Sequence, residues 1–342
     1  MLNFQFAQEY VQLDLFDDFG AEDRDAIVRK YIEIILENKA RPILDTLHLA
    51  RLVGFSEHFL FSVSTSAGHF YREYEIVKKS GGFRTINEPL PTLKAVQKVI
   101  VADLLRDVEP HKAAKAYRKN HTLRGNAVIH RRRPYMLKID IKNFFSNIDQ
   151  HAIYTLFYDL GYTSQIARLL TGLCILNNGL PQGAPTSPLL SNLVLRKFDE
   201  AVFAQCVERN IFYTRYADDM VFSSTADDLQ SLIPFIRKQL KNYRLEINEK
   251  KTVFAGTGAR KYVTGIVVNE KLNILKENRR KLRQEMYYVR KFGLNGHLRK
   301  TENNSANYVD RLIGRLNFAY FVTKESHFLN DMRYLRELKK II

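Results

Sequence analysis

Phe212-Tyr213-Thr214-Arg215-Tyr216-Ala217-Asp218-Asp219-Met220-Val221-Phe222 places two adjacent aspartates between two apolar segments. The pattern predicts a hairpin with strands over 212–216 and 220–224 and a tight turn at Ala217-Asp218-Asp219. Two carboxylates held together near a buried hairpin have raised pKa values unless a cation neutralises them. Mg²⁺, which prefers carboxylates and phosphate oxygens, is the natural counterion. The alternative is an ordinary polar turn, because Asp is common in turns, and the pair alone does not decide between the two.

A third carboxylate is predicted to lie near this turn. The segment Tyr135–Ile141 alternates like a strand, so Met136, Lys138 and Asp140 share one face, and Asp140 stands at the strand end. Three carboxylates in one core can hold two metal ions about 3.5–4 Å apart, which stabilise the attacking and leaving oxygens of a phosphoryl transfer. Other aspartates stand in helical or turn contexts and are expected at the surface: Asp149, Asp159 and Asp199.

A loop rich in glycine and proline lies between these segments, Gly179-Leu180-Pro181-Gln182-Gly183-Ala184-Pro185-Thr186-Ser187-Pro188. Ser187 is expected to cap the following helix, with Pro188 at its first position. Such a loop lets its backbone and the Gln182 amide approach a nucleotide closely. A plain connecting loop is an equally good interpretation of this segment taken alone.

Composition narrows the class of protein. The 342 residues are 45% hydrophobic, which excludes wholesale disorder, and no apolar run is long enough for a membrane span. The N-terminus lacks the features of a secretion signal. The sequence has two cysteines, Cys174 and Cys206, which argues against a disulfide scaffold or a zinc site and favours a location in the reducing cytoplasm.

The charge distribution points to a polyanion. The net charge is +16, and the segment 271–342 holds 17 Lys or Arg against seven Asp or Glu, a net +10. Tyrosines are interleaved among these cations, a pattern typical of a nucleic-acid-binding groove. A basic protein whose charge serves only solubility is the alternative.

Strands predicted over 74–78, 83–87 and near 262–268 alternate with helices, so we expect an α+β core followed by a helical tail.

In combination, these segments resemble a reverse transcriptase and, more narrowly, a bacterial retron reverse transcriptase. The resemblance covers roughly residues 70–270. Its blocks are, in chain order, Leu137–Phe145, Leu180–Gly183, Ser187-Pro188, Tyr216–Asp219, Leu245–Thr252 and Val263–Gly265. Asn126-Ala127-Val128-Ile129-His130 matches the N-A-x-x-H signature of retron enzymes, and Val263-Thr264-Gly265 matches their second signature. One block agrees easily by chance, whereas the ordered set is specific.

The resemblance implies an α+β right-hand polymerase with fingers, a palm built on an antiparallel sheet, and a helical thumb. We expect an N-terminal helical extension over 1–65, fingers and palm over 66–268, and a basic helical thumb over 269–342. Asp140, Asp218 and Asp219 would be the catalytic residues and the ligands of two Mg²⁺ ions, with Asp219 on the primer side.

The resemblance also implies binding roles. Arg84, with Lys78 or Lys79, is expected to grip the triphosphate, and Gln182 to contact the nucleotide or its template partner. Phe145, five residues after Asp140, would reject a ribose 2′-hydroxyl sterically, with core packing as the alternative for its ring. The residues expected to bind RNA or primer phosphates are Asn126, His130, Arg131, Val263, Thr264, Gly265 and Lys251.

By the same resemblance, the partners are dNTPs, a cognate noncoding RNA and an effector protein encoded nearby, in an antiphage defence system. Synthesis would start from a guanosine 2′-hydroxyl of that RNA and leave DNA branched from RNA. The alternatives are another bacterial reverse transcriptase, group II intron-like or defence-associated, and a catalytically silent, maturase-like RNA-binding protein. The three intact aspartates argue against a silent site.

Overall fold

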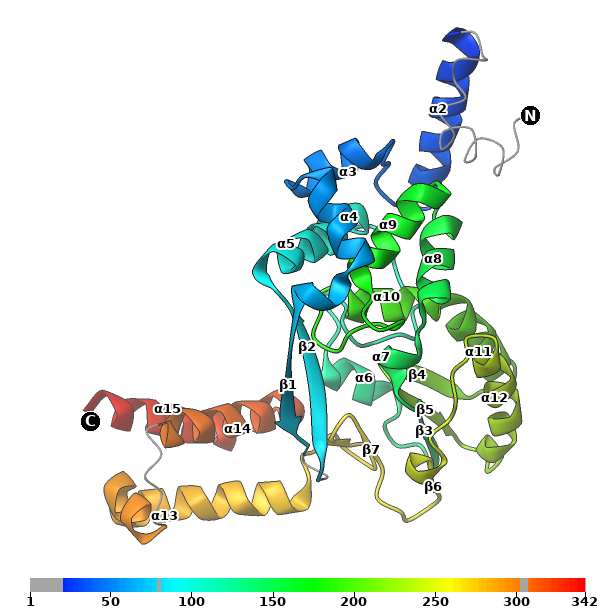
Figure 1. Cartoon of the computed structure of the whole chain (residues 1–342). Helices are drawn as coiled ribbons and strands as arrows, with labels where there is room; N and C mark the ends of the chain where they lie inside the picture. The colour runs from blue at the N-terminus through cyan, green and yellow to red at the C-terminus, as the bar shows by residue number, and fades with distance from the viewer. Residues whose placement is uncertain (1–20, 79–80, 302–306, 342) are drawn as a thin grey trace.

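The computed structural model of the chain describes residues 21–78, 81–301 and 307–341. It combines helices with antiparallel sheets, so the predicted α+β class is confirmed. Figure 1 shows helices of the N-terminal half at one end, a sheet below them, and the C-terminal helices projecting to one side.

The N-terminal helices join the main core. They are α2 (Ala21–Glu37), α3 (Thr46–Val53) and α4 (Glu57–Thr65). Tyr31, Leu49 and Leu60 are fully buried in the same cluster as Leu137 and Phe222 of the central sheet. The extension therefore packs on the rest of the chain and has no separate core among the described residues.

A long hairpin follows, formed by β1 (Tyr71–Val77) and β2 (Phe83–Pro89), and is called the fingers hairpin below. The two predicted strands are confirmed, and the pairing extends further toward the base of the hairpin. Apolar side chains at its free end face solvent: Val77 is 71% and Phe83 60% exposed. Both line the cleft described below.

Helices then surround the central sheet. Those before its first strand are α5 (Pro91–Val99), continued by a π-helical turn over Ile100–Leu104, and α6 (Leu123–Ile129). Those after it are α7 (Phe144–Asn147), α8 (Gln150–Asp159), α9 (Ser164–Cys174), α10 (Ser187–Val194), α11 (Arg196–Glu208) and α12 (Ile233–Lys241). Short 3-10 turns cover Ala67–Phe70, Leu229–Leu232 and Glu249–Lys251.

The central sheet, called the palm sheet below, has the antiparallel order β4-β5-β3-β6. Its strands are β3 (Tyr135–Asp140), β4 (Phe212–Tyr216), β5 (Asp219–Ser224) and β6 (Val253–Ala255). Alternation along β3 puts Leu137 and Ile139 in the main core, whereas Met136 and Val221 belong to a second core shared with the C-terminal helices. Because both faces are packed, the strand ends are held in fixed positions.

The prediction of a single strand near 262–268 is wrong. Tyr262–Val263 (β7) and Ile266–Val267 (β8) form a separate two-stranded hairpin around Thr264 and Gly265. The two turn residues have φ values of 47° and 82°, as a two-residue type I′ turn requires. A threonine with positive φ is uncommon, so residue type did not reveal this turn.

The C-terminal helices α13 (Lys276–Lys300), α14 (Tyr308–Thr323) and α15 (Ser326–Ile341) are called the thumb helices below. Leu282, Leu312 and Leu335 join them in the second core. Gly293 kinks α13 with a φ of 69°, a conformation that favours glycine. Throughout the described ranges, no helix combines the length and the apolar character that crossing a bilayer demands.

Candidate active site

The strand ends that carry carboxylates lie side by side in the palm sheet. Asp140, the last residue of β3, pairs with Asp219, the first residue of β5. The Ile141 amide donates to the Asp218 carbonyl at 3.0 Å, which ties the hairpin turn to the end of β3. The structure thus brings together the three aspartates that were predicted to meet.

A buried ion pair holds the turn that carries Asp218. Ala217 has a φ of 57°, a left-handed conformation that is uncommon for residues other than glycine. Arg215 donates from Nη1 to the Ala217 carbonyl at 3.1 Å. It binds Asp199 through Nε at 2.9 Å and Nη2 at 2.6 Å, with both side chains 0% exposed. The Ala217 carbonyl belongs to the peptide unit that joins Ala217 to Asp218. This network therefore fixes the orientation of the backbone at Asp218.

The expectation that Asp199 lies at the surface is therefore wrong. Its Oδ1 also accepts from the Tyr213 hydroxyl at 2.7 Å, and Arg215 Nη1 reaches Asn192 Oδ1 at 3.1 Å. Such complete hydrogen bonding offsets the desolvation of two buried charges. In the sequence, the sign of a buried acid was Arg215 in the predicted strand 212–216, because a buried arginine requires a charged partner.

Burial and repulsion act on the two hairpin carboxylates. Desolvation, followed by the charges of Asp219 and Asp140, raises the pKa of Asp218 to about 6. Desolvation also raises the pKa of Asp219, while the Lys138 ammonium opposes that shift. Both groups therefore sit where negative charge is incompletely compensated by protein.

Asp140 is held differently, by a lysine and an amide. Lys251 Nζ lies 3.1 Å from Oδ1 and 3.0 Å from Oδ2 of Asp140, and Asn248 Nδ2 donates to Oδ1 at 2.9 Å. The hydrogen bond to Asp140 is the main cause that raises the pKa of Lys251. Lys251, predicted to bind RNA or primer phosphates, thus lies beside the aspartates, and the contact of Asn248 was not predicted.

The donor chemistry of the site fits divalent cations. Carboxylates with raised pKa values gain most from a nearby cation, and oxygen ligands suit Mg²⁺. Within the part of the chain that the structure describes, no three His, Cys, Asp or Glu side chains are grouped around a common metal position. The Lys251 ammonium supplies the positive charge next to Asp140 in this arrangement.

A cleft of about 1080 Å³ extends from the fingers hairpin to the carboxylates. Its lining includes the predicted nucleotide-binding residues that the structure describes and two of the aspartates: Lys78, Arg84, Phe145, Gln182, Asp140 and Asp218. Lys79 lies outside the described residues. Exposed cations on the hairpin and carboxylates on the palm thus border one space, an arrangement suited to a nucleoside triphosphate.

The glycine- and proline-rich loop connects the fingers hairpin to this cleft. The Asn87 amide donates to the Gln182 carbonyl at 2.9 Å. Gly183 has a φ of 135°, and a Cβ there would lie 2.8 Å from the Asn87 carbonyl, so this close approach requires glycine. Ser187 begins α10, but its hydroxyl donates to the Pro181 carbonyl at 2.7 Å, so the predicted cap is wrong. The loop is held from both sides, which fixes Gln182 beside the cleft.

Phe145 is half-buried on the cleft wall among other rings. Its centroid lies 6.3 Å from that of Tyr117, which in turn lies 6.4 Å from Tyr216. Tyr117 was not predicted as a site residue, because it stands in an irregular segment without a motif. It has a φ of 59° and lines the same cleft, where desolvation and the charge of Asp218 raise its pKa.

The polar residues of the first retron signature, Asn126 and His130, are buried in the protein. His130 is 0% exposed, with Nδ1 2.7 Å from Ser223 Oγ and Nε2 2.8 Å from Thr214 Oγ1. Burial lowers its pKa to about 3, so the ring is neutral at pH 7. The ring bridges β4 and β5, the strands of the Asp218 hairpin, and holds α6 against them. This placement does not support the predicted direct contact of His130 with RNA.

The remaining predicted RNA-binding residues lie close by, with very different exposure. Asn126 is 2% exposed and Val263 0%, while Arg131 and Gly265 are exposed. Within the described ranges, neither polar atom of the Asn126 side chain has a hydrogen-bond partner, and the same holds for Thr264 Oγ1. Helix α6 packs on β7 and β8, so the two retron signatures form one joint between the palm sheet and the thumb helices.

An antiparallel sheet that brings three aspartates together, two of them lining a cleft with cations on its far wall, is the arrangement of a nucleic-acid polymerase. Residues 76–282 match the family model described as reverse transcriptase (RNA-dependent DNA polymerase). The chain therefore belongs to the reverse transcriptase family, among the retron enzymes, and it is an RNA-directed DNA polymerase with the right-hand polymerase fold.

Curated relatives agree with this assignment over most of their length. The Retron Ec86 reverse transcriptase of Escherichia coli is 31% identical over 74% of this chain and 81% of that protein. The Retron Ec83 reverse transcriptase of E. coli is 32% identical over 73% and 82%. The Retron Ec73 reverse transcriptase of E. coli is 28% identical over 79% and 89%. Among solved structures, a foamy viral protease-reverse transcriptase in complex with double-stranded DNA has a TM-score of 0.47 at 17% identity, covering 80% of this chain and 39% of that one.

Proposed function

We propose that this reverse transcriptase copies one cognate, structured noncoding RNA into DNA that remains branched from that RNA. Synthesis starts from a guanosine 2′-hydroxyl of the RNA. The pairing of Asp140 with Asp219, beside Asp218 at the end of the cleft, is the observation that carries the polymerase chemistry. The presence of both retron signatures, packed against one another, supports the retron part of the proposal.

Asp140, Asp218 and Asp219 would hold two Mg²⁺ ions, which when bound supply the charge that activates a primer hydroxyl and stabilises the pyrophosphate leaving group. The chain supplies the positioning. Arg215 holds the turn in front of Asp218, and Lys251 orients the Asp140 carboxylate.

The cleft residues would select and orient the deoxynucleotide. Lys78 and Arg84 on the fingers hairpin bind the triphosphate, together with Lys79, the residue that follows Lys78 in the sequence. Gln182 contacts the nucleotide or its template partner from the loop. Phe145 forms a flat wall against the sugar and rejects the ribose 2′-hydroxyl.

The chain would be organised as a helical extension over 1–65, fingers and palm over 66–268, and a basic thumb over 269–342. RNA recognition would use the thumb together with the joint made by α6 and the β7–β8 hairpin, where Arg131 and Gly265 are exposed. By resemblance to retron systems, the enzyme would act in the cytoplasm with an effector protein encoded nearby, as part of an antiphage defence.

Expression of the gene with its flanking DNA tests the retron part. The nucleic acid that copurifies with the chain should be a single RNA–DNA species, and ribonuclease treatment should leave DNA with a short branched RNA remnant. The Asp218→Asn variant should copurify with the same RNA but without DNA. Linear DNA copied from many RNAs would favour another bacterial reverse transcriptase, and cellular RNA without DNA would favour the silent, maturase-like alternative.

A further inference from the structure

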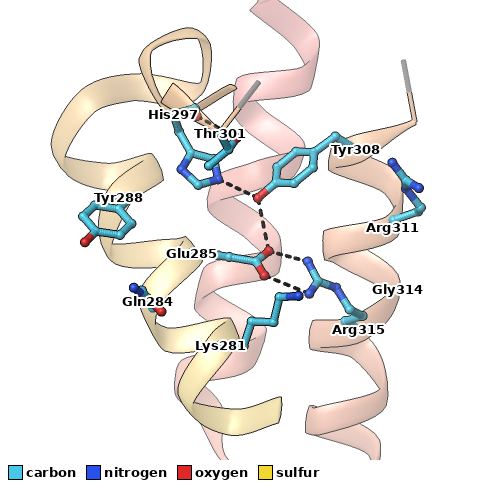
Figure 2. A pocket seen from close by; sticks show the side chains of 10 residues that line it. All are labelled: Lys281, Gln284, Glu285, Tyr288, His297, Thr301, Tyr308, Arg311, Gly314 and Arg315. Carbon is cyan, nitrogen blue, oxygen red and sulfur yellow. Dashed lines mark hydrogen bonds and ion pairs between the residues drawn. The ribbon is translucent and has the colours of Figure 1, made fainter. Parts of the chain in front are cut away.

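A hollow of about 820 Å³ opens between α13 and α14 of the thumb helices, and it shares no lining residue with the catalytic cleft. Figure 2 shows Glu285 reaching from α13 toward Tyr308 and Arg315, which extend from α14. Its volume lies in the range of about 300–1,000 Å³ that is usual for small-ligand sites.

The floor of the hollow is a closed polar network. Arg315 binds the Glu285 carboxylate with two nitrogens, one of them at 2.9 Å. The Tyr308 hydroxyl donates to Glu285 Oε2 at 3.1 Å, and His297 Nε2 lies 2.8 Å from the same hydroxyl. Because the hydroxyl proton goes to Glu285, His297 Nε2 must be the donor to Tyr308. The carboxylate is thus fully engaged, and the floor presents no free negative charge.

One wall of the hollow is aromatic. The kink at Gly293 folds the end of α13 back, so that the His297 ring lies 6.3 Å from the Tyr288 ring at an interplanar angle of 17°. Tyr288 is only half-buried and lines the hollow. Partly exposed flat rings can serve as platforms on which nucleic-acid bases stack.

The rim of the hollow is cationic. Lys281 and Arg311 line it, both are exposed, and neither has an ion-pair partner among the residues that the structure describes. Uncompensated cations beside a partly exposed ring match a ligand that joins a flat base to a phosphate.

Gly314 lies in the wall of the hollow. It lies within α14, its φ is not positive, and an added Cβ would meet no atom within 4 Å. Neither backbone conformation nor close packing therefore requires glycine, although glycine inside a helix is unfavourable relative to alanine. What the glycine does provide is free space in the wall of the hollow.

A second hollow continues this surface across α13. It shares Gln284 and Tyr288 with the first and adds Arg280, Arg283 and Tyr287. Tyr287 is 55% exposed, and its ring meets that of Tyr288 at 5.6 Å. Two rings and four cations thus follow one another over two adjacent depressions, as a strand with successive bases and phosphates would need.

We propose that the hollow between α13 and α14 binds one unstacked nucleotide of a single-stranded nucleic-acid segment, with its base on Tyr288 and its phosphate between Lys281 and Arg311. The neighbouring hollow then receives the next part of the same strand. This site rests on the proposed function only in that the enzyme handles RNA and DNA strands. It goes beyond that function because it lies outside the cleft in which nucleotides are joined.

Filling the space at Gly314 tests the site in the full-length enzyme. Gly314→Phe should weaken binding of a fluorescent ten-nucleotide single strand about tenfold, while Gly314→Ala, which leaves the space open, should bind as the unmodified chain does. Unchanged melting temperatures would show that both variants fold. Equal affinity of the Phe and Ala variants for RNA and for DNA strands would overturn the proposal.

The cations provide an independent test. Lys281→Gln and Arg311→Gln should each reduce the slope of log affinity against log salt by about 0.7 for a single strand. Arg336→Gln, an exposed thumb cation outside the two hollows, serves as the control of equal charge. If the control lowers the slope as much as the two test variants do, the thumb attracts nucleic acid only through its overall charge, and the site is refuted.

The same strands separate the two possible sources of the nucleotide. A larger loss for the RNA strand than for the DNA strand assigns the site to the RNA, and the reverse assigns it to the DNA product; either supports the site. Extension of a short primer on a generic RNA template should persist in Gly314→Phe. That activity depends on the aspartates, so its loss in Asp218→Asn and persistence in Gly314→Phe keep the two proposals distinguishable.

Discussion

The palm sheet and the thumb helices place their charges in opposite ways. In the palm, the side chains of Arg215 and Asp199 are both 0% exposed. Arg215 binds the Asp199 carboxylate with two hydrogen bonds of fixed geometry. In the thumb, Arg290 is 48% exposed in its pair with Asp331. A buried pair holds one geometry, whereas exposed cations can exchange partners with water and phosphate. The same residue types therefore position a turn in one region and remain available for a polyanion in the other.

Breaking the buried pair should have the largest effect on stability. Arg215→Met leaves Asp199 charged and buried without its partner, which should lower the free energy of unfolding by about 3–5 kcal/mol. Arg290→Met, the matched change in the thumb, should lower it by less than about 1 kcal/mol. Urea unfolding followed by circular dichroism measures both. Similar losses in the two variants would remove the contrast between the regions.

The pH dependence of stability should differ in sign between a palm and a thumb carboxylate. The pKa of Asp218 is raised to about 6, so the folded chain binds this proton more tightly than the unfolded chain, and stability is lost as pH rises toward 6. Hydrogen bonding to Arg279 lowers the pKa of Glu325, so its contribution is instead lost as pH falls.

In EDTA, the unmodified chain should therefore gain about 1 kcal/mol relative to Asp218→Asn when the pH drops from 7 to 5. Glu325→Gln should stay nearly parallel to the unmodified chain over this interval, because the contribution of a carboxylate whose pKa is lowered by folding is lost only below the ordinary Glu pKa of 4.5. The measurement is the unfolding free energy at both pH values for all three proteins. If the difference in unfolding free energy between Asp218→Asn and the unmodified chain does not change with pH, Asp218 is not held in a desolvated position.

Sugar selection should depend on a ring in the palm cleft and not on rings in the thumb. Phe145→Ala removes the wall beside the cleft and should raise incorporation of ribonucleotides relative to deoxyribonucleotides about tenfold. Tyr288→Ala, which removes a half-buried ring from the thumb, should leave this ratio unchanged. Competition between one ribonucleotide and its deoxy counterpart on a single template measures it. An unchanged ratio in Phe145→Ala would assign that ring to core packing.

Local patterns were sufficient for the strands that carry the aspartates. The hairpin around Asp218 and the strand ending at Asp140 were predicted from alternation and turn composition, whereas the pairing of β3 with β5 is seen only in the structure. The β7–β8 hairpin was missed because Thr264 adopts a conformation that its residue type disfavours.

The burial of polar side chains was the feature that the sequence predicted least well. His130 meets Ser223 and Thr214, which lie 93 and 84 residues away, and Asp199 meets Arg215 across two elements. Whether such a residue faces solvent or a distant partner is decided by tertiary packing, which no local pattern reports. The thumb hollow was inaccessible for the same reason, since Glu285, His297 and Arg315 form its floor only after the kink at Gly293.

The most direct test of the palm assignment is DNA synthesis by Asp218→Asn on an RNA template, with Mg²⁺ and dNTPs. Asp159→Asn, an exposed carboxylate paired with Lys197, is the control. The assignment predicts that Asp218→Asn loses activity by about 1,000-fold or more while binding RNA normally, and that the control remains active. Synthesis by Asp218→Asn at a rate close to that of the control would contradict it.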